Sequence, residues 1–248
     1  MDPAVPEIVV LPDPEALAEA AARRILEAAL SAVADHGRFT IALSGGATPR
    51  DTYMRLAAPP YSEAMPWSQT YVFFGDERCV PPDHSSSNSR MAAETLLGKV
   101  AIPASQVFTM SGEAEDVDVA AAEYGRTLAR EFGTRRGEMP RFDLILLGMG
   151  LDGHTGSLFP GSPVLKEIFR PVVAVHAAAA VIPHRLTFTL PVLNAAALVM
   201  FLVSGQEKAK TVKAVLGDGA LLPAGLVRPT AGRLVWMVDR AAAGLLKS

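Results

Sequence analysis

The feature that most constrains the fold is a run of four apolar residues that stops at a glycine-rich bend. The run Leu144–Leu147 is followed by residues 148–156, which contain four glycines together with Asp152 and His154. A strand that is apolar at every position is typical of a parallel sheet covered on both faces, and glycines leave room for a ligand to approach the backbone. The run therefore predicts a buried parallel strand with a histidine at its end.

Strands and helices alternate along the rest of the chain. Residues 14–36 carry apolar side chains at helical spacing, with acidic residues early and Gly37 directly after the end. The remaining elements that we expect are strands 39–43, 71–74, 144–147, 186–189, 198–203 and 234–238, a possible strand 107–110, helices 88–97, 117–132 and 206–216, and a short C-terminal helix. This alternation predicts one α/β domain over residues 1–248, built on a parallel sheet with helices on both faces.

Composition argues against several classes of partner. Half of the 248 residues are hydrophobic, and the formal net charge of -3 favours neither nucleic acid nor an anionic membrane as a partner. No apolar stretch approaches the roughly 20 residues that a membrane span needs. The single cysteine, Cys79, excludes an internal disulfide, and residues 1–11 do not resemble a signal peptide. We therefore expect a cytoplasmic protein.

Four polar segments directly follow apolar runs, at residues 44–49, 75–78, 148–154 and 204–208. In an open parallel sheet, ligands bind at the carboxyl ends of the strands. If the sheet is parallel, all four segments face one crevice. Their side chains are therefore the candidates for binding and chemistry.

Residues 44–49 have the physical features of a phosphate loop. The segment contains Ser44, Gly45, Gly46 and Thr48, ahead of a helix that we expect to start at Pro49. Backbone N–H groups at such a helix start point at an anion. An ordinary strand-to-helix turn has a similar composition, and the segment is neither a Walker motif nor a dinucleotide fingerprint.

Lys208 favours the phosphate interpretation. A cation in the first turn of a helix opposes the helix macrodipole unless an anion lies beside it. A phosphate that bridges the two helix starts would explain both features. The alternative is a solvated lysine, because Lys210 and Lys213 occupy the same predicted helix.

Two further segments carry charge at strand ends. Asp76, Glu77 and Arg78 either bind sugar hydroxyls and negative charge or form a local ion-pair cluster. Asp152 and His154 are separated by one residue, which allows the carboxylate to orient the imidazole as a general base.

The Gly-x-Ser-x-Gly elbow of serine hydrolases and the spacings of metal-binding histidines or cysteines are absent from the sequence. The remaining chemistry is water activated by His154 and directed at a phosphorylated small molecule.

Taken together, these motifs resemble the 6-phosphogluconolactonases, which form one family with the glucosamine-6-phosphate deaminases. The resemblance covers most of the chain and runs through residues 43–49, 76–81 with His84 and residues 87–89, 148–160, 183–187 and 204–209. It implies a three-layer α/β/α sandwich with a mainly parallel, Rossmann-like sheet. It also implies hydrolysis of a small-molecule sugar-phosphate lactone in the oxidative pentose phosphate pathway, without cofactor or metal. We expect a monomer or a weak homo-oligomer.

The resemblance also suggests roles for individual side chains. The candidate catalytic residues are His154, Asp152, Arg78 and Asp76, and the candidate substrate- and phosphate-binding residues are Ser44, Gly45, Gly46, Thr48, Arg185 and Lys208. Under this hypothesis His154 activates the water and Asp152 supports the imidazole. The division of work among Asp76, Arg78 and Arg185 stays open.

Two alternatives belong to other functional classes. The deaminases share the phosphate loop and the Asp-Gly-His signature, but continue with Asn-Glu-Pro, whose glutamate takes part in ring opening. Here His154 is followed by Thr155, Gly156 and Ser157, so that glutamate is missing. A non-catalytic sugar-phosphate-sensing module is the third hypothesis, and no helix-turn-helix is evident before Phe39 to support it.

Overall fold

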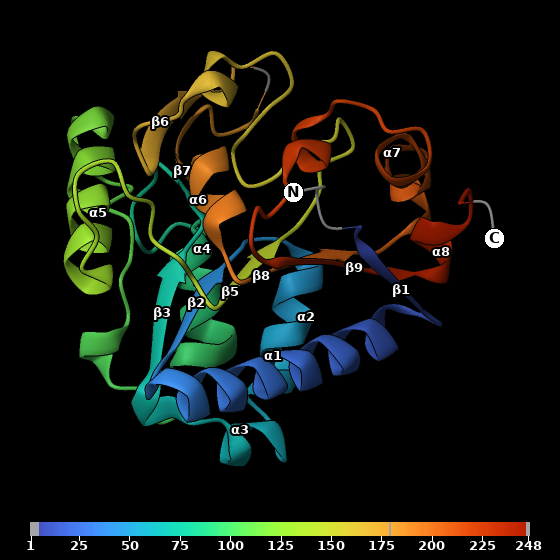
Figure 1. The fold of residues 1–248 in the computed structure, drawn as a ribbon, viewed down its shortest axis with the longest axis horizontal. Coiled ribbons are helices and arrows are strands. Elements are labelled where there is room, and N and C mark those ends of the chain that lie inside the picture. The colour runs from blue at the N-terminus through green and yellow to red at the C-terminus, as the bar shows by residue number, and fades with distance from the viewer. Residues whose placement is uncertain (1–4, 179, 247–248) are drawn as a thin grey trace.

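The apolar run Leu144–Leu147 forms strand β5 inside a six-stranded sheet of order β1-β9-β8-β5-β2-β3 (Figure 1). Every neighbouring pair in this sheet is parallel. The other strands are β1 (Glu7–Leu11), β2 (Phe39–Leu43), β3 (Thr70–Phe74), β8 (Leu198–Val203) and β9 (Arg233–Asp239). The computed structural model describes residues 5–178 and 180–246. Residues 1 and 248, the expected limits of the domain, lie outside this range. So do residues 1–4 of the N-terminal segment 1–11, which does not resemble a signal peptide.

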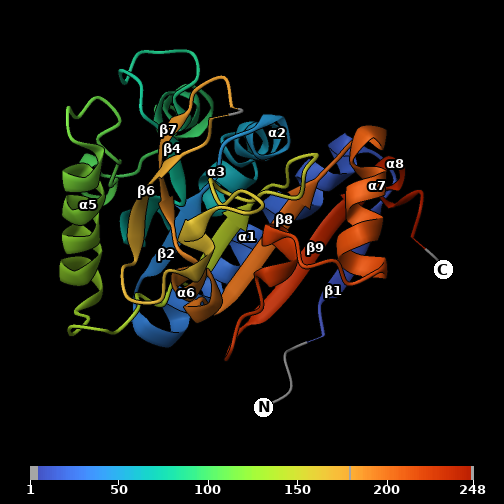
Figure 2. The same cartoon turned by 90° about the horizontal axis from the view of Figure 1, so that it is seen from above.

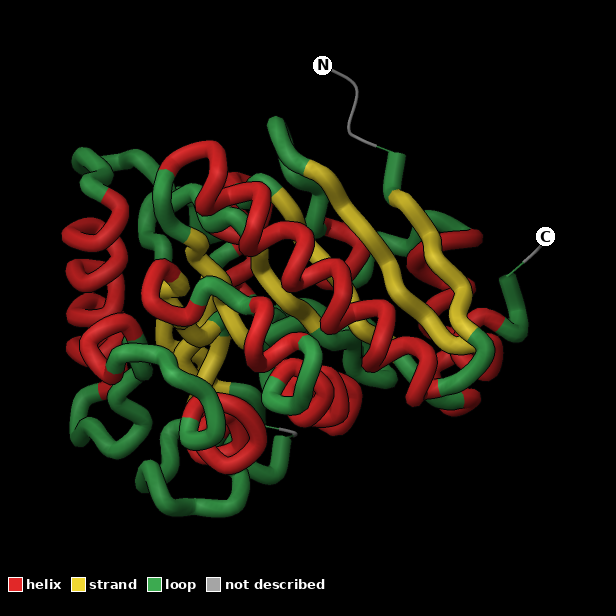
Figure 3. Tube along the Cα trace, turned by 90° about the horizontal axis from the view of Figure 1, so that it is seen from below, coloured by secondary structure: helices red, strands yellow, loops and turns green. Residues whose placement is uncertain are grey.

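Alternate side chains of β5 enter different hydrophobic cores, which explains why the strand is apolar throughout. Leu144 and Leu146 belong to the core formed with α1 (Pro14–His36) and α2 (Ala47–Leu56). Figure 3 shows α1 lying across this face of the sheet. Ile145 and Leu147 belong to the core on the opposite face. The helices α5 (Val117–Phe132), α6 (Leu190–Ala195) and α7 (Ala209–Val212) cover that face (Figure 2).

The ends of α1 lie where the sequence predicts them. The Asp13 carboxylate accepts a hydrogen bond from the N–H of Ala16 at 2.8 Å, and Pro14 occupies the first helical turn, where its missing N–H costs nothing. At the other end Gly37 adopts φ 83°, and its N–H bonds to the carbonyl of Val33. A left-handed glycine of this kind is a common helix stop.

The layer opposite α1 also contains a three-stranded antiparallel sheet that the sequence did not reveal as a unit. Its order is β4-β7-β6, formed by β4 (Asp76–Arg78), β7 (His184–Phe188) and β6 (Val172–His176). The charged residues after β3 therefore form a short strand, because β7 supplies hydrogen-bonding partners for them.

Other elements differ from the expectations in their details. The possible strand 107–110 is wrong, since Val107 makes only an isolated bridge to Val72. The expected helix 88–97 is α4 (Asn88–Ala92) followed by a π-helical turn (Ala93–Leu97), and helix 206–216 is a 3₁₀ turn (Gln206–Lys208), α7 and a π-helical turn (Lys213–Gly217). The remaining short elements are α3 (Tyr61–Ala64), α8 (Arg240–Ala243) and 3₁₀ turns at Trp67–Gln69, Ala104–Gln106, Pro163–Lys166 and Pro223–Leu226.

Within the part of the chain that the structure describes, no helix combines the length and the apolar character required to cross a bilayer.

Candidate active site

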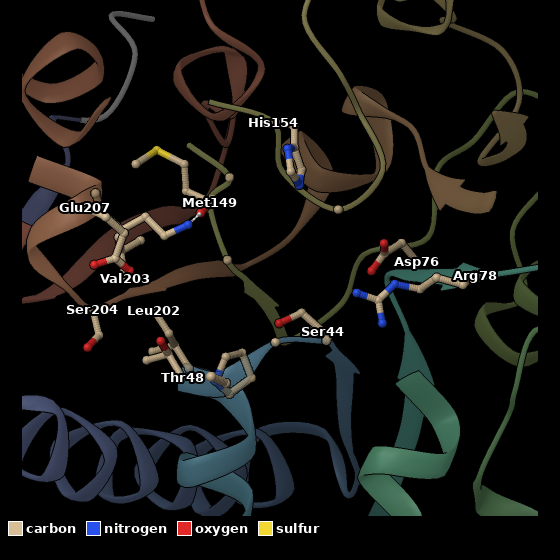
Figure 4. A pocket seen from close by; sticks show the side chains of 18 of the residues that line it. Ser44, Thr48, Asp76, Arg78, Met149, His154, Leu202, Val203, Ser204 and Glu207 are labelled. Atoms are coloured by element: carbon tan, nitrogen blue, oxygen red, sulfur yellow. Dashed lines mark hydrogen bonds between the residues drawn. The ribbon is translucent and has the colours of Figure 1, made fainter. Parts of the chain in front are cut away.

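The four polar segments meet at the carboxyl ends of the parallel strands, around a cavity of about 380 Å³ (Figure 4). Nine of the ten candidate site residues line it: Ser44, Gly45, Gly46, Thr48, Asp76, Arg78, His154, Arg185 and Lys208. The tenth, Asp152, lies behind the imidazole of His154 and contacts it. Parallel strands place their carboxyl ends at the same edge of a sheet, so residues more than 150 positions apart in the sequence share one cavity.

Ser44 directly follows strand β2 and lines the cavity, and a buried tyrosine holds it there. The hydroxyl of Tyr53 accepts a hydrogen bond from the N–H of Ser44 at 2.9 Å and donates one to its carbonyl at 2.8 Å. Burial raises the pKa of Tyr53 well above its ordinary value, which keeps this hydroxyl neutral. The Ser44 Oγ is itself buried and has no hydrogen-bond partner among the described residues. It is therefore free to bind a ligand.

The residues after Ser44 form the start of α2. Gly46 adopts φ 113°, and the helix begins at Ala47, two residues earlier than the expected start at Pro49. None of the side chains that the structure describes caps this end of the helix, so its first N–H groups remain available to an anion. The positive φ makes glycine the residue of choice at position 46.

Lys208 lies in the 3₁₀ turn that follows strand β8 and lines the same cavity. The Lys208 Nζ donates a hydrogen bond to the carbonyl of Met149 at 2.9 Å, and both residues line the cavity. The side chain of Glu207 also lines the cavity, a position that the sequence analysis did not single out. Its position beside Lys208, in the polar segment 204–208 that follows β8, was the available signal.

His154 is held by Asp152 through two contacts. The carboxylate Oδ1 lies 2.6 Å from the imidazole Nδ1 and accepts the backbone N–H of His154 at 3.1 Å. Partial burial opposes ionisation of Asp152, but these hydrogen bonds and the charge of the imidazole outweigh it and lower the pKa of the carboxyl. Since Nδ1 is engaged, Nε2 is the ring nitrogen available for proton transfer.

Gly150 allows the imidazole to lie against the backbone. A Cβ at this position would sit 2.1 Å from the Nδ1 of His154 and 2.7 Å from the Oδ1 of Asp152. Both distances are far inside van der Waals contact, so a side chain would displace the histidine. This glycine is therefore required by the packing of the candidate base.

Two arginines face the cavity from the small sheet. Arg78 of β4 and Arg185 of β7 lie directly opposite each other, although like charges in this position destabilise a strand pair. Burial, followed by the nearby Arg78 charge, lowers the pKa of Arg185. The Arg78 Nε is buried without a hydrogen-bond partner among the described residues. The pair therefore provides a strongly cationic wall suited to negative charge.

Asp76 and Arg78 are positioned by Asn88, a residue that the sequence analysis did not identify as part of the site. The Asn88 Nδ2 donates to the carbonyl of Asp76 at 2.9 Å and to its Oδ1 at 3.2 Å, while its Oδ1 accepts from the Nη1 of Arg78 at 2.6 Å. Asn88 in turn donates its backbone N–H to the buried carboxylate of Glu77 at 2.8 Å. Glu77 thus supports the site from behind and does not line it.

Replacing Gly45 by Ala should disturb this network. A Cβ on Gly45 would sit 1.9 Å from the Oδ1 of Asn88, so the amide must move and release both Asp76 and Arg78. We expect kcat/KM to fall at least about tenfold and the free energy of unfolding to fall by about 1–3 kcal/mol. Steady-state kinetics and urea denaturation measure the two effects.

Gly217→Ala is the matched control, because a Cβ there meets only ordinary contacts at 3.6 and 3.9 Å and Gly217 does not line the cavity. If Gly45→Ala behaved like this control, Asn88 would not be a constraint on the site.

The arrangement has a counterpart among known proteins. Residues 12–236 match the family described as glucosamine-6-phosphate isomerases/6-phosphogluconolactonase. The chain belongs to this family. Among its relatives in the family, the 6-phosphogluconolactonase of Rattus norvegicus is 40% identical over 250 residues, which cover 98% of this chain and 95% of the relative. That of Nostoc sp. is 39% identical over 238 residues, covering 95% of this chain and 96% of the relative.

Solved structures of the family share the fold. A 6-phosphogluconolactonase from Trypanosoma cruzi aligns over all of both chains with a TM-score of 0.88 at 29% identity. One from Trypanosoma brucei aligns over 98% of this chain and 99% of its own, with a TM-score of 0.84 at 32% identity. A monomeric glucosamine-6-phosphate deaminase has the same fold, with a TM-score of 0.78 at 22% identity. The predicted α/β class with its mainly parallel sheet is confirmed.

Proposed function

We propose that this chain is a carboxylic ester hydrolase that converts 6-phospho-D-glucono-1,5-lactone to 6-phospho-D-gluconate in the oxidative pentose phosphate pathway. One observation carries the proposal: the imidazole of His154, held at Nδ1 by Asp152, faces the same cavity as an uncapped helix start and Lys208. A base at one end and an anion site at the other match a substrate with a lactone carbonyl and a phosphate. The names of the relatives point to the same reaction.

The phosphate of the lactone rests on the segment from Ser44 to Thr48 and on Lys208. The free N–H groups of α2, the unpartnered Ser44 Oγ and the lysine ammonium are donors suited to a dianion. Binding the phosphate at this end orients the lactone carbonyl towards His154 and removes much of the entropic cost of the reaction.

His154 acts as general base and then as general acid. Its Nε2 takes a proton from water, and the hydroxide adds to C1 of the lactone to give a tetrahedral oxyanion. When the bond between C1 and the ring oxygen breaks, the imidazolium returns the proton to that oxygen. Asp152 supports the imidazolium, and the cationic wall of Arg78 and Arg185 stabilises the oxyanion or holds hydroxyls together with Asp76.

Deaminase activity is the rival function, and the segment after His154 argues against it. The deaminase signature places a glutamate there, whereas this chain has Thr155, Gly156 and Ser157. Ser157 is buried and donates its hydroxyl to the carboxylate of Asp76 at 2.8 Å. This segment therefore brings no carboxylate of its own to the cavity.

An assay that generates the lactone in place distinguishes the candidate functions. Glucose-6-phosphate dehydrogenase produces the lactone from glucose 6-phosphate, and we expect the purified chain to accelerate its disappearance above the spontaneous rate. Ammonia release from glucosamine 6-phosphate would instead support the deaminase. Binding of sugar phosphates without turnover of either substrate would support the sensing module.

The proposal extends to the setting of the enzyme. The net charge of -3 supports a small-molecule ligand without nucleic acid, and the single cysteine supports a reducing, cytoplasmic setting. Both hydrophobic cores share the six-stranded sheet, which supports one domain. We further propose that the enzyme acts as a monomer or a weak homo-oligomer.

A further inference from the structure

Phe159 contacts two side chains of the candidate active site without lining the cavity itself. Its ring centroid lies 4.5 Å from that of the His154 imidazole, with 35° between the ring planes. The Cζ of Arg185 lies 5.5 Å from the same phenyl centroid. One aromatic ring therefore touches both the candidate base and a cation of the arginine wall.

A tight reversal of the chain returns Phe159 to His154. Thr155 and Leu158 form an isolated bridge, and the N–H of Leu158 bonds to the carbonyl of Thr155 at 2.9 Å. Gly156 takes the positive φ of 53° that the reversal needs. Leu158 is fully buried in the core, so the position of the next residue is well determined.

Asp152 alone does not define the orientation of the imidazole. The hydrogen bond at Nδ1 and the backbone of Gly150 restrain the Nδ1 side of the imidazole. The ring of Phe159 adds a further contact that restrains the plane of the imidazole and so the direction of Nε2. Arg185, in contrast, has an independent support, because its Nε donates to the carbonyl of Ile182 at 2.9 Å.

We propose that Phe159 is a positioning residue for the reaction, which orients His154 and stabilises its protonated form. The inference rests on the proposed function. Aromatic faces attract cations, and the imidazolium exists only after the proton has left water. The interaction is therefore stronger in the transition state than in the ground state, which is the condition for accelerating the chemical step.

The test compares two substitutions of Phe159 with a matched control. Phe159→Leu keeps an apolar side chain of similar bulk but removes the aromatic face, and Phe159→Tyr keeps the face. Phe169→Leu is the control, since Phe169 is 75% exposed and does not line the cavity. For Phe159→Leu we expect kcat to fall about tenfold with KM within about threefold of the parent value. Phe159→Tyr should retain most of the activity, and the control all of it.

The pH dependence separates this role from simple packing. Without the aromatic face the protonated imidazole is less favoured, so the acidic limb of the kcat profile should move to lower pH in Phe159→Leu and return in Phe159→Tyr. The imidazole C–H resonance of His154, assigned by its loss in His154→Gln, should titrate with the same displacement in NMR spectra.

Failure of this inference differs from failure of the proposed function. If His154→Gln is inactive but Phe159→Leu matches the parent in kcat and in the NMR titration, the positioning role is overturned and the proposed function stands. It is also overturned if Leu and Tyr lose activity equally and lower the melting temperature together. If His154→Gln remains active, the proposed mechanism fails, while the NMR titration still tests the contact between the two rings.

Discussion

Replacing His154 by Gln should lower kcat about 10²- to 10⁴-fold, the range that a positioned general base contributes. Glutamine keeps a polar side chain of similar reach but accepts no proton from water at neutral pH. The Nδ1 contact at 2.6 Å with Asp152 holds the imidazole in place and leaves Nε2 for the proposed proton transfer. Because the proposed phosphate site lies at the other end of the cavity, KM should change much less. Steady-state kinetics on freshly generated lactone measure both constants.

His176→Gln is the matched control for this variant. His176 is an exposed histidine at the end of β6 and does not line the cavity. It should therefore retain parental kinetics. Near-parental kcat in His154→Gln, with an unchanged circular dichroism spectrum, would remove His154 from the chemistry.

The support from Asp152 has a defined dependence on pH. Its pKa is lowered in the folded chain, so the carboxylate is fully ionised above its ordinary pKa, throughout the neutral range. The stabilisation that its ionised form provides is lost only as the pH falls through the lowered folded value. A loss of activity at near-neutral pH is thus not caused by protonation of Asp152.

Replacing Lys208 by Ala should raise KM about 10- to 100-fold, with a smaller effect on kcat. A hydrogen bond to a charged group contributes about 1.5–3 kcal/mol, and the ammonium is the cation at the uncapped start of α2. Uniform loss of binding to ground and transition states appears in KM. Titration calorimetry with 6-phosphogluconate measures the affinity directly.

Lys210→Ala provides the control, because Lys210 is an exposed lysine of the same segment. It removes the same charge from the molecule without touching the cavity. Equal affinity of Lys208→Ala and Lys210→Ala for 6-phosphogluconate would exclude Lys208 from the phosphate site.

Elements with a strong local pattern were predicted from the sequence to the residue. Pro14–His36 carries its own start and stop signals, and Leu144–Leu147 is apolar because both faces are covered. The edge strand Glu7–Leu11 was not recognised, since only alternate residues of it are shielded. The charged strand Asp76–Arg78 was not recognised as a strand, because its strand character comes from pairing with β7 and not from its own residues.

The same division applies to the site. The residues that directly follow apolar strands, such as Ser44, His154 and Lys208, were selected from the sequence, because parallel topology brings strand ends to one edge. Asn88 and Phe159 were not selected, since nothing in their local sequence marks what they touch. Glu207 was not selected either, although it lies beside Lys208 in the sequence. The contact between Asn88 and Arg78 depends on how β4 packs against α4.

The sequence by itself therefore determined the α/β alternation and selected the candidate base and the candidate phosphate loop, because each depends on residues that are neighbours in the chain. Only the tertiary structure decided that Asp76 is held by Asn88 and Ser157, that two arginines face each other across β4 and β7, and that Phe159 returns to the imidazole. These contacts join segments whose relative positions are set by the packing of the small sheet on the large one, which no local pattern encodes.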